Sequence, residues 1–262
     1  MTKIQAHRGA CSERPENTMA AFRRAIELHA DGIETDVALL ADGSLIIHHD
    51  DKFGRTVPGL SGSIYDHTFE EIRKHSAGAY YSKEYKDEKV PTLEELLELM
   101  QGNSMILNVE LKTAQGFING VEDRVVELLR QYTIRGASTA KIRQYHMEDR
   151  CIISSFHHPY LANIKKRYPQ IPVGALYYST LGWKIPDLAD YAAANHFDAL
   201  HAWYPLVNEE LVEKAHRMGI AVNVWTPDEE ADIDRMLDLG VDTIITDDAA
   251  LGMKLRDASE SK

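Results

Sequence analysis

The chain has 262 residues, with 44% hydrophobic and 27% charged residues, an ordinary balance for a soluble protein. This length allows one large α/β domain with a substantial core. The 41 acidic and 29 basic residues give a formal net charge of −12, which argues against a basic surface for nucleic acids or anionic membranes. An anionic small molecule is still compatible with this charge, because a bound cation can reverse the local sign.

Cysteine content and hydropathy indicate the compartment. Cys11 and Cys151 are the two cysteines, too few for a disulfide framework. The sequence shows no charged-then-apolar leader before Ile4 and no apolar run of membrane-spanning length. We therefore expect a soluble, cytoplasmic protein with no stable membrane association and no nucleic-acid partner. The sequence does not define the oligomeric state.

Short apolar runs alternate with amphipathic stretches from the first residues to the last. Strands are predicted over 3–7, 32–37, 45–49, 105–111, 151–155, 172–176, 198–201, 220–225 and 242–246. Helices are predicted over 17–30, 68–75, 92–101, 119–132, 158–168, 186–194, 208–218, 228–238 and 248–255. This alternation indicates βαβ units and a mostly parallel sheet.

Eight of the predicted strands are each followed by a helix if the run 45–49 is set aside. Eight such units in about 250 residues are typical of a (β/α)8, or TIM, barrel. We predict this α/β fold, as a single domain over residues 1–262, ahead of a doubly wound open sheet. The segment 7–10, which follows the first strand, does not match the G-x-G-x-x-G nucleotide motif.

A small insertion is expected after the second barrel strand. Asp42-Gly43 is a tight-turn dipeptide, so residues 33–49 are predicted to form a strand, a turn and a short returning strand. Residues 50–90 then make an irregular segment with several glycines and a tyrosine-rich stretch. An insertion at this point would cap the C-terminal mouth of the barrel, where substrates of this fold bind.

Three carboxylates are predicted to face the barrel axis. Side chains alternate between the two faces of a strand, so Glu34 and Asp36 share one face, and Glu110 and Lys112 share the axial face of a neighbouring strand. Carboxylates gathered in one small volume repel one another without a cation, and oxygen-rich sites suit Mg²⁺ or Ca²⁺. We predict one divalent cation at these three acids. The alternative is a neutralised network in which Lys112 pairs with Glu110.

Histidines near strand ends are the candidates for acid–base chemistry. His7 ends the first strand beside Arg8, and His49 ends the returning strand. Because histidine titrates near neutrality, one imidazole can accept a proton while the other donates one. The residues alone do not decide between His48 and His49. His201, at the end of the sixth barrel strand, is a further possible pocket residue.

Two cations and a tryptophan complete the candidate site. Arg8 can grip a phosphate in bidentate fashion, or pair with a loop acid such as Glu16, or do both. Lys112 adds a point charge beside the carboxylates. Trp225 ends the seventh barrel strand, where it would either wall the substrate pocket or pack in the core.

Two polar segments are explained by structural roles alone. Asn17 or Thr18 is a good N-cap for the helix that begins here, and this capping role explains both residues. Thr246 and Asp247 end the last strand and are expected to cap the last helix.

Motifs along the whole chain resemble the glycerophosphodiester phosphodiesterase family. The matching stretches are His7-Arg8-Gly9, Pro15-Glu16-Asn17-Thr18, GIETDV at 32–37, Asp42-Gly43, His49-Asp50, Arg55-Thr56, Pro91-Thr92-Leu93, NVELK at 108–112, VNVWT at 222–226 and GVDTIITD at 240–247. Each alone is a weak signal, but together, in order, they are a strong one. The chain departs from the family at His48, where an apolar residue is usual, and at Val57, where a second threonine is usual.

The resemblance implies a (β/α)8 barrel and metal-dependent hydrolysis of glycerophosphodiesters to sn-glycerol 3-phosphate and an alcohol. Glycerophosphocholine and glycerophosphoethanolamine are examples of such substrates. By position it implies an acid–base pair, three metal ligands and two phosphate contacts: His7 and His49; Glu34, Asp36 and Glu110; Arg8 and Lys112. It also favours His49 over His48, because the family's histidine directly precedes an aspartate.

Three other functions are alternatives to this one. A barrel could bind phosphodiesters or metal without turnover. A related phospholipase D-like branch acts on choline phospholipids, but the chain shows no apolar membrane-facing loop, although the Tyr80-Tyr81 pair is a weak sign in that direction. A sugar-phosphate isomerase on the same fold would need a phosphate site near the last two strands, and the region from Gly240 to Thr246 has no glycine-rich cradle.

Overall fold

The structure, a computed structural model, describes residues 1–113, 120–135, 147–178 and 187–260. Its main sheet runs in the order β1-β11-β10-β9-β8-β7-β6-β2-β3, and β1 also pairs with β2, so eight strands close on themselves with β3 attached outside the circle. The eight barrel strands, all paired in parallel, are β1 (Lys3–Ala6), β2 (Gly32–Leu39), β6 (Ile106–Leu111), β7 (Cys151–Ser155), β8 (Val173–Tyr177), β9 (Ala199–Trp203), β10 (Ala221–Trp225) and β11 (Thr243–Thr246).

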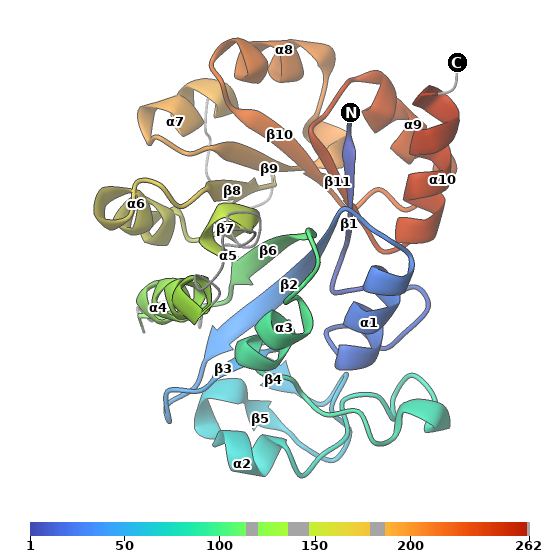
Figure 1. The fold of residues 1–262 in the computed structure, drawn as a ribbon, viewed down its shortest axis with the longest axis vertical. Coiled ribbons are helices and arrows are strands. Elements are labelled where there is room, and N and C mark those ends of the chain that lie inside the picture. The colour runs from blue at the N-terminus through green and yellow to red at the C-terminus, as the bar shows by residue number, and fades with distance from the viewer. Residues whose placement is uncertain (114–119, 136–146, 179–186, 261–262) are drawn as a thin grey trace.

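Helices follow the strands and lie outside them (Figure 1). They are α1 (Met19–Glu27), α3 (Leu93–Leu99), α4 (Val121–Arg135), α6 (His158–Arg167), α7 (Leu188–Ala194), α8 (Glu209–Arg217), α9 (Glu230–Asp238) and α10 (Ala249–Glu260), with a short α5 (Met147–Arg150) before β7 and a 3-10 turn η5 (Tyr204–Leu206) after β9. The predicted (β/α)8 barrel is therefore confirmed. The first residues of the helices predicted over 119–132 and 186–194 lie outside the described residues.

The core follows from the strand alternation predicted for β6. Leu107, Val109 and Leu111 are buried in the main hydrophobic cluster between strands and helices. On the opposite face, the Asn108 amide oxygen accepts a hydrogen bond from Ser154 Oγ at 2.9 Å, and Glu110 borders a cavity. One face of the strand therefore holds the helices on, and the other supplies polar groups to the interior.

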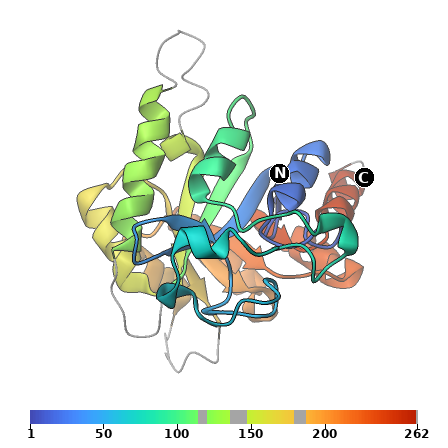
Figure 2. The ribbon, with the colours of Figure 1, turned by 90° about the horizontal axis from the view of Figure 1, so that it is seen from below.

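The segment between β2 and α3 has its own small core. β3 (Leu45–Ile47) returns antiparallel to β2, as predicted from the Asp42-Gly43 turn. It is followed by β4 (Lys52–Phe53), β5 (Gly62–Ser63), the 3-10 turns η1 (Ile64–Asp66) and η2 (Lys83–Tyr85), and α2 (Phe69–Ile72). The apolar side chains of this segment form a second buried cluster with Phe53, Ile64 and Ile72 at its centre. In Figure 2, which views the molecule from below, the segment lies in front of the barrel.

None of the described helices combines the length and the apolar composition needed to span a membrane.

Candidate active site

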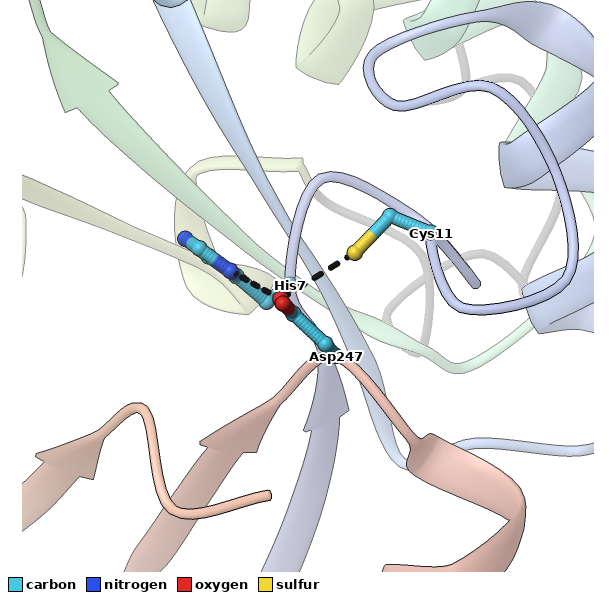
Figure 3. Close-up of side chains that lie close together, drawn as sticks. All are labelled: His7, Cys11 and Asp247. Atoms are coloured by element: carbon cyan, nitrogen blue, oxygen red, sulfur yellow. Dashed lines mark hydrogen bonds and ion pairs between the residues drawn. The ribbon is translucent and has the colours of Figure 1, made fainter. Parts of the chain in front are cut away.

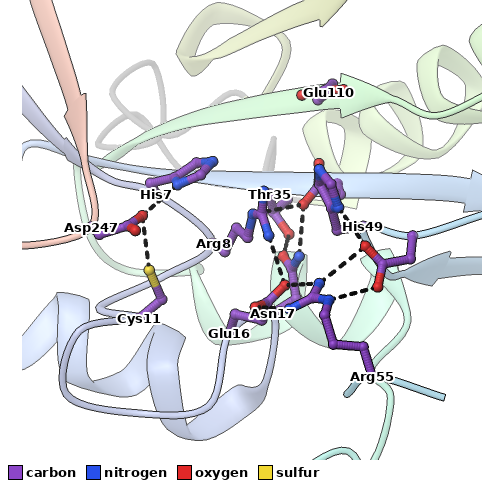
Figure 4. Close-up of polar contacts among 12 residues, drawn as sticks. His7, Arg8, Cys11, Glu16, Asn17, Thr35, His49, Arg55, Glu110 and Asp247 are labelled. Atoms are coloured by element: carbon purple, nitrogen blue, oxygen red, sulfur yellow. Dashed lines mark hydrogen bonds and ion pairs between the residues drawn. The ribbon is translucent and has the colours of Figure 1, made fainter. Parts of the chain in front are cut away.

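The polar residues singled out in the sequence come together at the C-terminal ends of β1, β2 and β6. His7 directly follows β1, and Glu34 and Asp36 lie in β2. β6 is the parallel neighbour of β2, with Asp36 opposite Glu110 in the register. Because parallel strands end at one edge, the barrel brings these side chains to one side of its axis, as Figure 4 shows for His7 and Glu110.

The acidic cluster contains Glu34, Asp36 and Glu110, each offering one oxygen within 4.8 Å of the others. Burial, together with repulsion from Asp36 and Glu110, raises the pKa of Glu34 to about 8. The Asp36 carboxyl is fully buried. Burial alone would raise the pKa of Asp36, but the charges of Lys112 and Arg8 outweigh it and lower that pKa far below its usual range. Three carboxyl groups that are buried this close together require positive charge among them if they are to be ionised.

Lys112 supplies part of that charge. Its Nζ lies 2.6 Å from Glu110 Oε1 and 3.1 Å from Asp36 Oδ1. The neutralised pairing of Lys112 with Glu110, considered as the alternative to a metal site, is therefore present in the structure. It does not satisfy the whole cluster, because Glu34 keeps a raised pKa beside Asp36 and Glu110.

Asp36 is fixed from the opposite side by Asn17. The Asn17 amide donates to Asp36 Oδ2 at 2.7 Å and accepts from Thr35 Oγ1 at 2.8 Å. Asn17 has a positive φ of 55° and precedes the helix, which begins at Met19 with Thr18 as its N-cap. The predicted capping role is thus correct for Thr18 and wrong for Asn17. The predicted helix start at 17 is also wrong, because the left-handed conformation at Asn17 turns its amide toward the buried acid.

The turn after β1 sets the position of Arg8. Arg8 and Gly9 both have positive φ, 55° and 78°, and a Cβ on Gly9 would come within 2.7 Å of Ala21 in α1. This tight turn directs the Arg8 backbone N–H to Glu34 Oε2 at 2.9 Å. The Arg8 guanidinium donates to Glu16 Oε1 at 2.7 Å, so the predicted salt bridge is confirmed, and Arg8 also borders the cavity beside the acids.

His7 is held between two carboxylates. Its Nδ1 lies 2.5 Å from Asp247 Oδ1 (Figure 3). Its Nε2 lies 3.8 Å from Glu34 Oε2. Burial would lower the pKa of His7, but the Glu34 charge and the hydrogen bond to Asp247 outweigh it and raise that pKa. With Nδ1–H donating to Asp247, Nε2 faces the acidic cluster with its lone pair free.

Asp247 is therefore a site residue that the sequence analysis missed. It was given a capping role in the last helix, but α10 begins only at Ala249, and the Asp247 carboxylate accepts from His7 and from Cys11 Sγ at 3.1 Å. Nothing local to position 247 signals this contact, because its partners lie about 240 residues away in the sequence. Only closure of the barrel, which pairs β1 with β11, brings them together.

His49, rather than His48, faces the site. His49 is partly exposed and borders the cavity, and its Nδ1 lies 2.8 Å from Asp50 Oδ1. His48 is buried with its ring centroid 4.8 Å from that of Phe53. Burial lowers the pKa of His48 to about 4, which leaves it neutral and unsuited to donate a proton near neutrality.

Arg55 connects the loop of His49 with the loop of Arg8. Its guanidinium donates to Glu16 Oε2 at 2.6 Å and to Asp50 Oδ2 at 2.7 Å. Glu16 thus lies between Arg55 and Arg8, as Figure 4 shows. No local pattern in the sequence predicts this connection between the loops.

A cavity of about 130 Å³ lies among these groups, bordered by His7, Arg8, Glu34, His49, Asn108, Glu110, Lys112, Ser154, Phe156, Leu176, Trp225, Thr226 and Ile245. A more open hollow of about 460 Å³ shares His49, Glu110, Lys112 and Phe156 with it. A larger cavity of about 350 Å³ at the opposite end of the barrel is bordered by Gln5, Arg150 and Cys151. We place the site in the smaller cavity, because that is where the acids and histidines converge.

Trp225 both borders the cavity and packs against its neighbours. Its ring lies 5.7 Å from Phe156 and 6.2 Å from Tyr178, centroid to centroid, and its indole N–H donates to the His201 carbonyl at 2.9 Å. Trp225 therefore packs against aromatic neighbours while it borders the cavity, and its role toward a substrate stays a prediction. Phe156 and Tyr178 were not anticipated as neighbours of the site.

His201 is not a residue of this cavity. It is completely buried inside the barrel, where the Asn223 amide nitrogen lies 2.9 Å from its Nε2. A Cβ on Gly174 would lie 2.2 Å from that same atom, so the glycine makes room for the ring. Burial lowers the pKa of His201 to about 3. The expectation of a pocket histidine at this position is wrong because the ring fills the core of the barrel.

Comparison with known proteins identifies the family of the chain. The sequence model described as "Glycerophosphoryl diester phosphodiesterase family" matches residues 7–251. The chain belongs to this family. It is 38% identical over 249 residues to a glycerophosphodiester phosphodiesterase of Caldanaerobacter subterraneus, with 94% of each chain covered. It is 35% identical to one of Bacillus altitudinis, with 98% of this chain and 99% of the relative covered.

Solved structures of related proteins share the fold. A phosphodiesterase of Oleispira antarctica in complex with the product sn-glycerol-3-phosphate superposes with a TM-score of 0.84 at 26% identity, covering 98% of this chain and 97% of the other. A glycerophosphodiester phosphodiesterase of Agrobacterium tumefaciens gives a TM-score of 0.78 at 25% identity, covering 96% and 99%. The predicted family, fold and enzyme class are thus confirmed. The roles assigned to individual residues stay predictions.

Proposed function

We propose that the protein hydrolyses glycerophosphodiesters to sn-glycerol 3-phosphate and an alcohol, with one divalent cation, Mg²⁺ or Ca²⁺, at Glu34, Asp36 and Glu110. The observation that carries this proposal is the convergence of three carboxylates with two histidines on one cavity. The Oleispira antarctica relative was solved with sn-glycerol-3-phosphate as its product, and this gives the product class. The chain has a net charge of −12, so a small anionic diester can bind only where positive charge is concentrated. A divalent cation together with Arg8 and Lys112 would provide that charge.

The residues present fit a hard divalent cation. Their donors are oxygens, which Mg²⁺ and Ca²⁺ prefer. Glu34, Asp36 and Glu110 bring three oxygens within 4.8 Å of one another, and burial and neighbouring acids raise the pKa of Glu34 to about 8. Both features are expected of ligands that lack their ion. When bound, such a cation polarises a nonbridging phosphate oxygen and neutralises charge that develops on it.

His7 and His49 are proposed as the acid–base pair. Both border the cavity, and each has a carboxylate on Nδ1, Asp247 for His7 and Asp50 for His49. A carboxylate on Nδ1 directs Nε2 outward as the working atom. One imidazole deprotonates the nucleophile, either water or the glycerol 2-hydroxyl, and the other protonates the leaving alkoxide. Each role is typically worth about 10²–10⁴-fold in rate.

Arg8, Lys112 and Trp225 are proposed to bind the substrate. The two cations border the cavity beside the acids, where preorganised positive charge stabilises the negative charge that grows on the phosphoryl oxygens. In the ion-free protein Lys112 pairs with Glu110 and Asp36, and a cation bound at these acids would release its ammonium for the substrate. Trp225 closes the cavity on its apolar side beside Phe156.

We also propose that residues 1–262 act as one catalytic domain in which the insertion at about 50–90 caps the mouth. Two contacts support this arrangement. The Tyr80 hydroxyl accepts from the Glu16 backbone N–H at 3.1 Å, and Arg55 bridges Glu16 and Asp50. The insertion therefore touches the loop that carries Arg8 and Glu16, and it supports His49 through Asp50.

The function is tested by release of glycerol 3-phosphate from a panel of glycerophosphodiesters, among them glycerophosphocholine and glycerophosphoethanolamine. We expect product release with added Mg²⁺ or Ca²⁺, none in chelator, and recovery when the metal is returned. A choline phospholipid in the same panel tests the phospholipase D-like alternative. Absence of turnover on every diester, with the protein folded and metal present, would leave the non-catalytic binding barrel as the better account.

A further inference from the structure

A second group of potential metal ligands lies beside the acidic cluster. His7, Cys11 and Asp247 each offer one donor atom, and these atoms all lie within 4.8 Å of one another (Figure 3). Two of the distances are to one oxygen, Asp247 Oδ1: His7 Nδ1 lies 2.5 Å from it and Cys11 Sγ lies 3.1 Å from it. We propose that this group is a binding site for a thiophilic divalent cation such as Zn²⁺, and that its occupation stops His7 from acting in catalysis.

The donor set distinguishes this site from the proposed catalytic one. An imidazole nitrogen, a thiolate and a carboxylate are the three protein ligands that a Zn²⁺ ion commonly takes, with water in the fourth position. Thiolate and imidazole ligands select Zn²⁺ over Mg²⁺ and Ca²⁺, whereas the three carboxylates suit the harder ions. We therefore expect Zn²⁺ at His7, Cys11 and Asp247, and Mg²⁺ or Ca²⁺ at the three carboxylates. The two ions can then be bound at the same time.

The fold places the three ligands before any ion arrives. His7 lies at the end of β1 and Asp247 directly after β11, two strands paired in register. The tight turn at Arg8-Gly9 brings Cys11 back, with its N–H donating to the Gly9 carbonyl at 2.8 Å. The Ser12 N–H donates to the Asp247 carbonyl at 3.2 Å, which fixes the turn to the end of β11. Cys11 is partly exposed, so an ion can reach it.

Binding balances in charge and protons. Without an ion, burial and the charge of Asp247 raise the pKa of the Cys11 thiol, which stays protonated and donates to that carboxylate. On binding, bonds from the ion to Sγ, to His7 Nδ1 and to the Asp247 oxygen replace both hydrogen bonds. The thiol proton leaves to solvent, and the His7 proton moves from Nδ1 to Nε2. A thiolate and a carboxylate then neutralise the divalent ion.

The consequence for His7 follows from its tautomer. In the ion-free protein Nδ1–H donates to Asp247, so Nε2, 3.8 Å from Glu34, is free to accept a proton. With the ion on Nδ1, the neutral ring carries its proton on Nε2 and can no longer act as a base. It is also a far weaker acid than an imidazolium. Inhibition is the expected result, and this readout rests on the proposed function of His7.

Binding is tested first without reference to activity. Cd²⁺ is titrated into the full chain with Ca²⁺ saturating the carboxylates, and the thiolate-to-cadmium charge-transfer absorbance is followed. The wild type is compared with Cys11→Ser, Cys11→Ala and a matched control, Cys151→Ala, which removes the buried cysteine in β7. We expect a band that saturates at one Cd²⁺ per chain in the wild type and in the control, and no band in either Cys11 variant. A band that persists without Cys11, or none in the wild type, would overturn the site.

Inhibition is tested next, by Zn²⁺ titration of diester hydrolysis at saturating Mg²⁺, each variant scaled to its own rate without Zn²⁺. We expect the half-inhibiting Zn²⁺ concentration to rise by at least about tenfold in Cys11→Ser and to stay unchanged in Cys151→Ala. Equal inhibition of all variants would place Zn²⁺ at the carboxylates and contradict the proposed effect on His7. A chain that shows the Cd²⁺ band but no diesterase activity would refute the proposed function while leaving the metal site intact.

Discussion

His7 and His49 border one cavity but are held by different parts of the molecule. His7 lies at the end of a barrel strand, between Asp247 and Glu34, and is largely buried. His49 follows the short outer strand β3, its side chain is 34% exposed, and its partner Asp50 is tied to the surface residue Arg55. The barrel framework thus fixes one imidazole, and an ion-pair network between loops fixes the other. The His7 ring, with 16% of its side chain exposed, should be less sensitive to changes in solvent than the His49 ring, with 34% exposed.

The largest expected effect is loss of either imidazole. His7→Ala and His49→Ala should each lower the rate of glycerol 3-phosphate release by about 10²–10⁴-fold at saturating metal, because each removes one proton transfer. The control is His216→Ala, which removes a surface histidine of α8 that pairs with Asp242. This variant should keep the wild-type rate. Near-wild-type turnover in either site variant would remove that histidine from the scheme.

The buried acid Glu34, which lies beside His7 in the barrel, predicts a metal affinity that depends on pH. Because the pKa of Glu34 is raised to about 8 in the ion-free protein, this acid holds a proton below that pH, and a divalent cation must displace it. Affinity for Ca²⁺ should therefore rise about tenfold per pH unit between pH 6 and 8 and level off above. Isothermal titration across this range checks the slope. A flat profile would show that Glu34 is already ionised and that the burial argument fails.

The partners of the two histidines should differ in importance. Asp247→Asn is expected to cost about 10–100-fold in kcat/KM, since it disturbs the tautomer of a buried ring. Asp50→Asn should cost less, because water can replace a partner at a half-exposed ring. Asp247 also raises the pKa of His7, so its removal should move the limb of the pH–rate profile that belongs to His7 to lower pH. Equal losses in the two variants would remove the distinction between the two environments.

The smallest expected effect concerns the loop network. Arg55→Ala should lower kcat/KM only a few-fold, because half-exposed ion pairs such as those of Arg55 with Glu16 and Asp50 are weak and are screened by salt. Rates of the wild type measured at rising ionic strength should approach those of the variant. If activity is insensitive to salt while Arg55→Ala is strongly impaired, Arg55 has a role in substrate binding rather than in supporting His49.

The same contrast explains what the sequence could predict. Alternation along β2 and β6 placed Glu34, Asp36 and Glu110 on inward faces, because each assignment needs only neighbouring residues and the period of a strand. The barrel itself followed from eight repeats of strand and helix. The resemblance of His49-Asp50 to a family motif separated His49 from His48, which the residues alone had left open.

Contacts between distant segments could not be predicted in this way. Asp247 looked like a capping residue, and its role beside His7 arises only from closure of β11 onto β1. Asn17 looked like a helix cap, but its left-handed backbone points the amide at Asp36. His201 lies near the end of its strand, where a pocket residue is expected. Its ring instead lies in the core, in the space that the missing side chain of Gly174 leaves. In each case a tertiary neighbour overrode a local preference.

The position of the divalent ion is the point on which the account depends, and anomalous diffraction from crystals soaked in Mn²⁺, an ion that accepts the same oxygen ligands, measures it most directly. We predict one strong peak within about 2.0–2.6 Å of oxygens from Glu34, Asp36 and Glu110, with the Lys112 ammonium displaced from its place between Asp36 and Glu110. A cluster that stays closed around Lys112 at millimolar Mn²⁺, with no peak among the three acids, would contradict the proposed metal-dependent hydrolase.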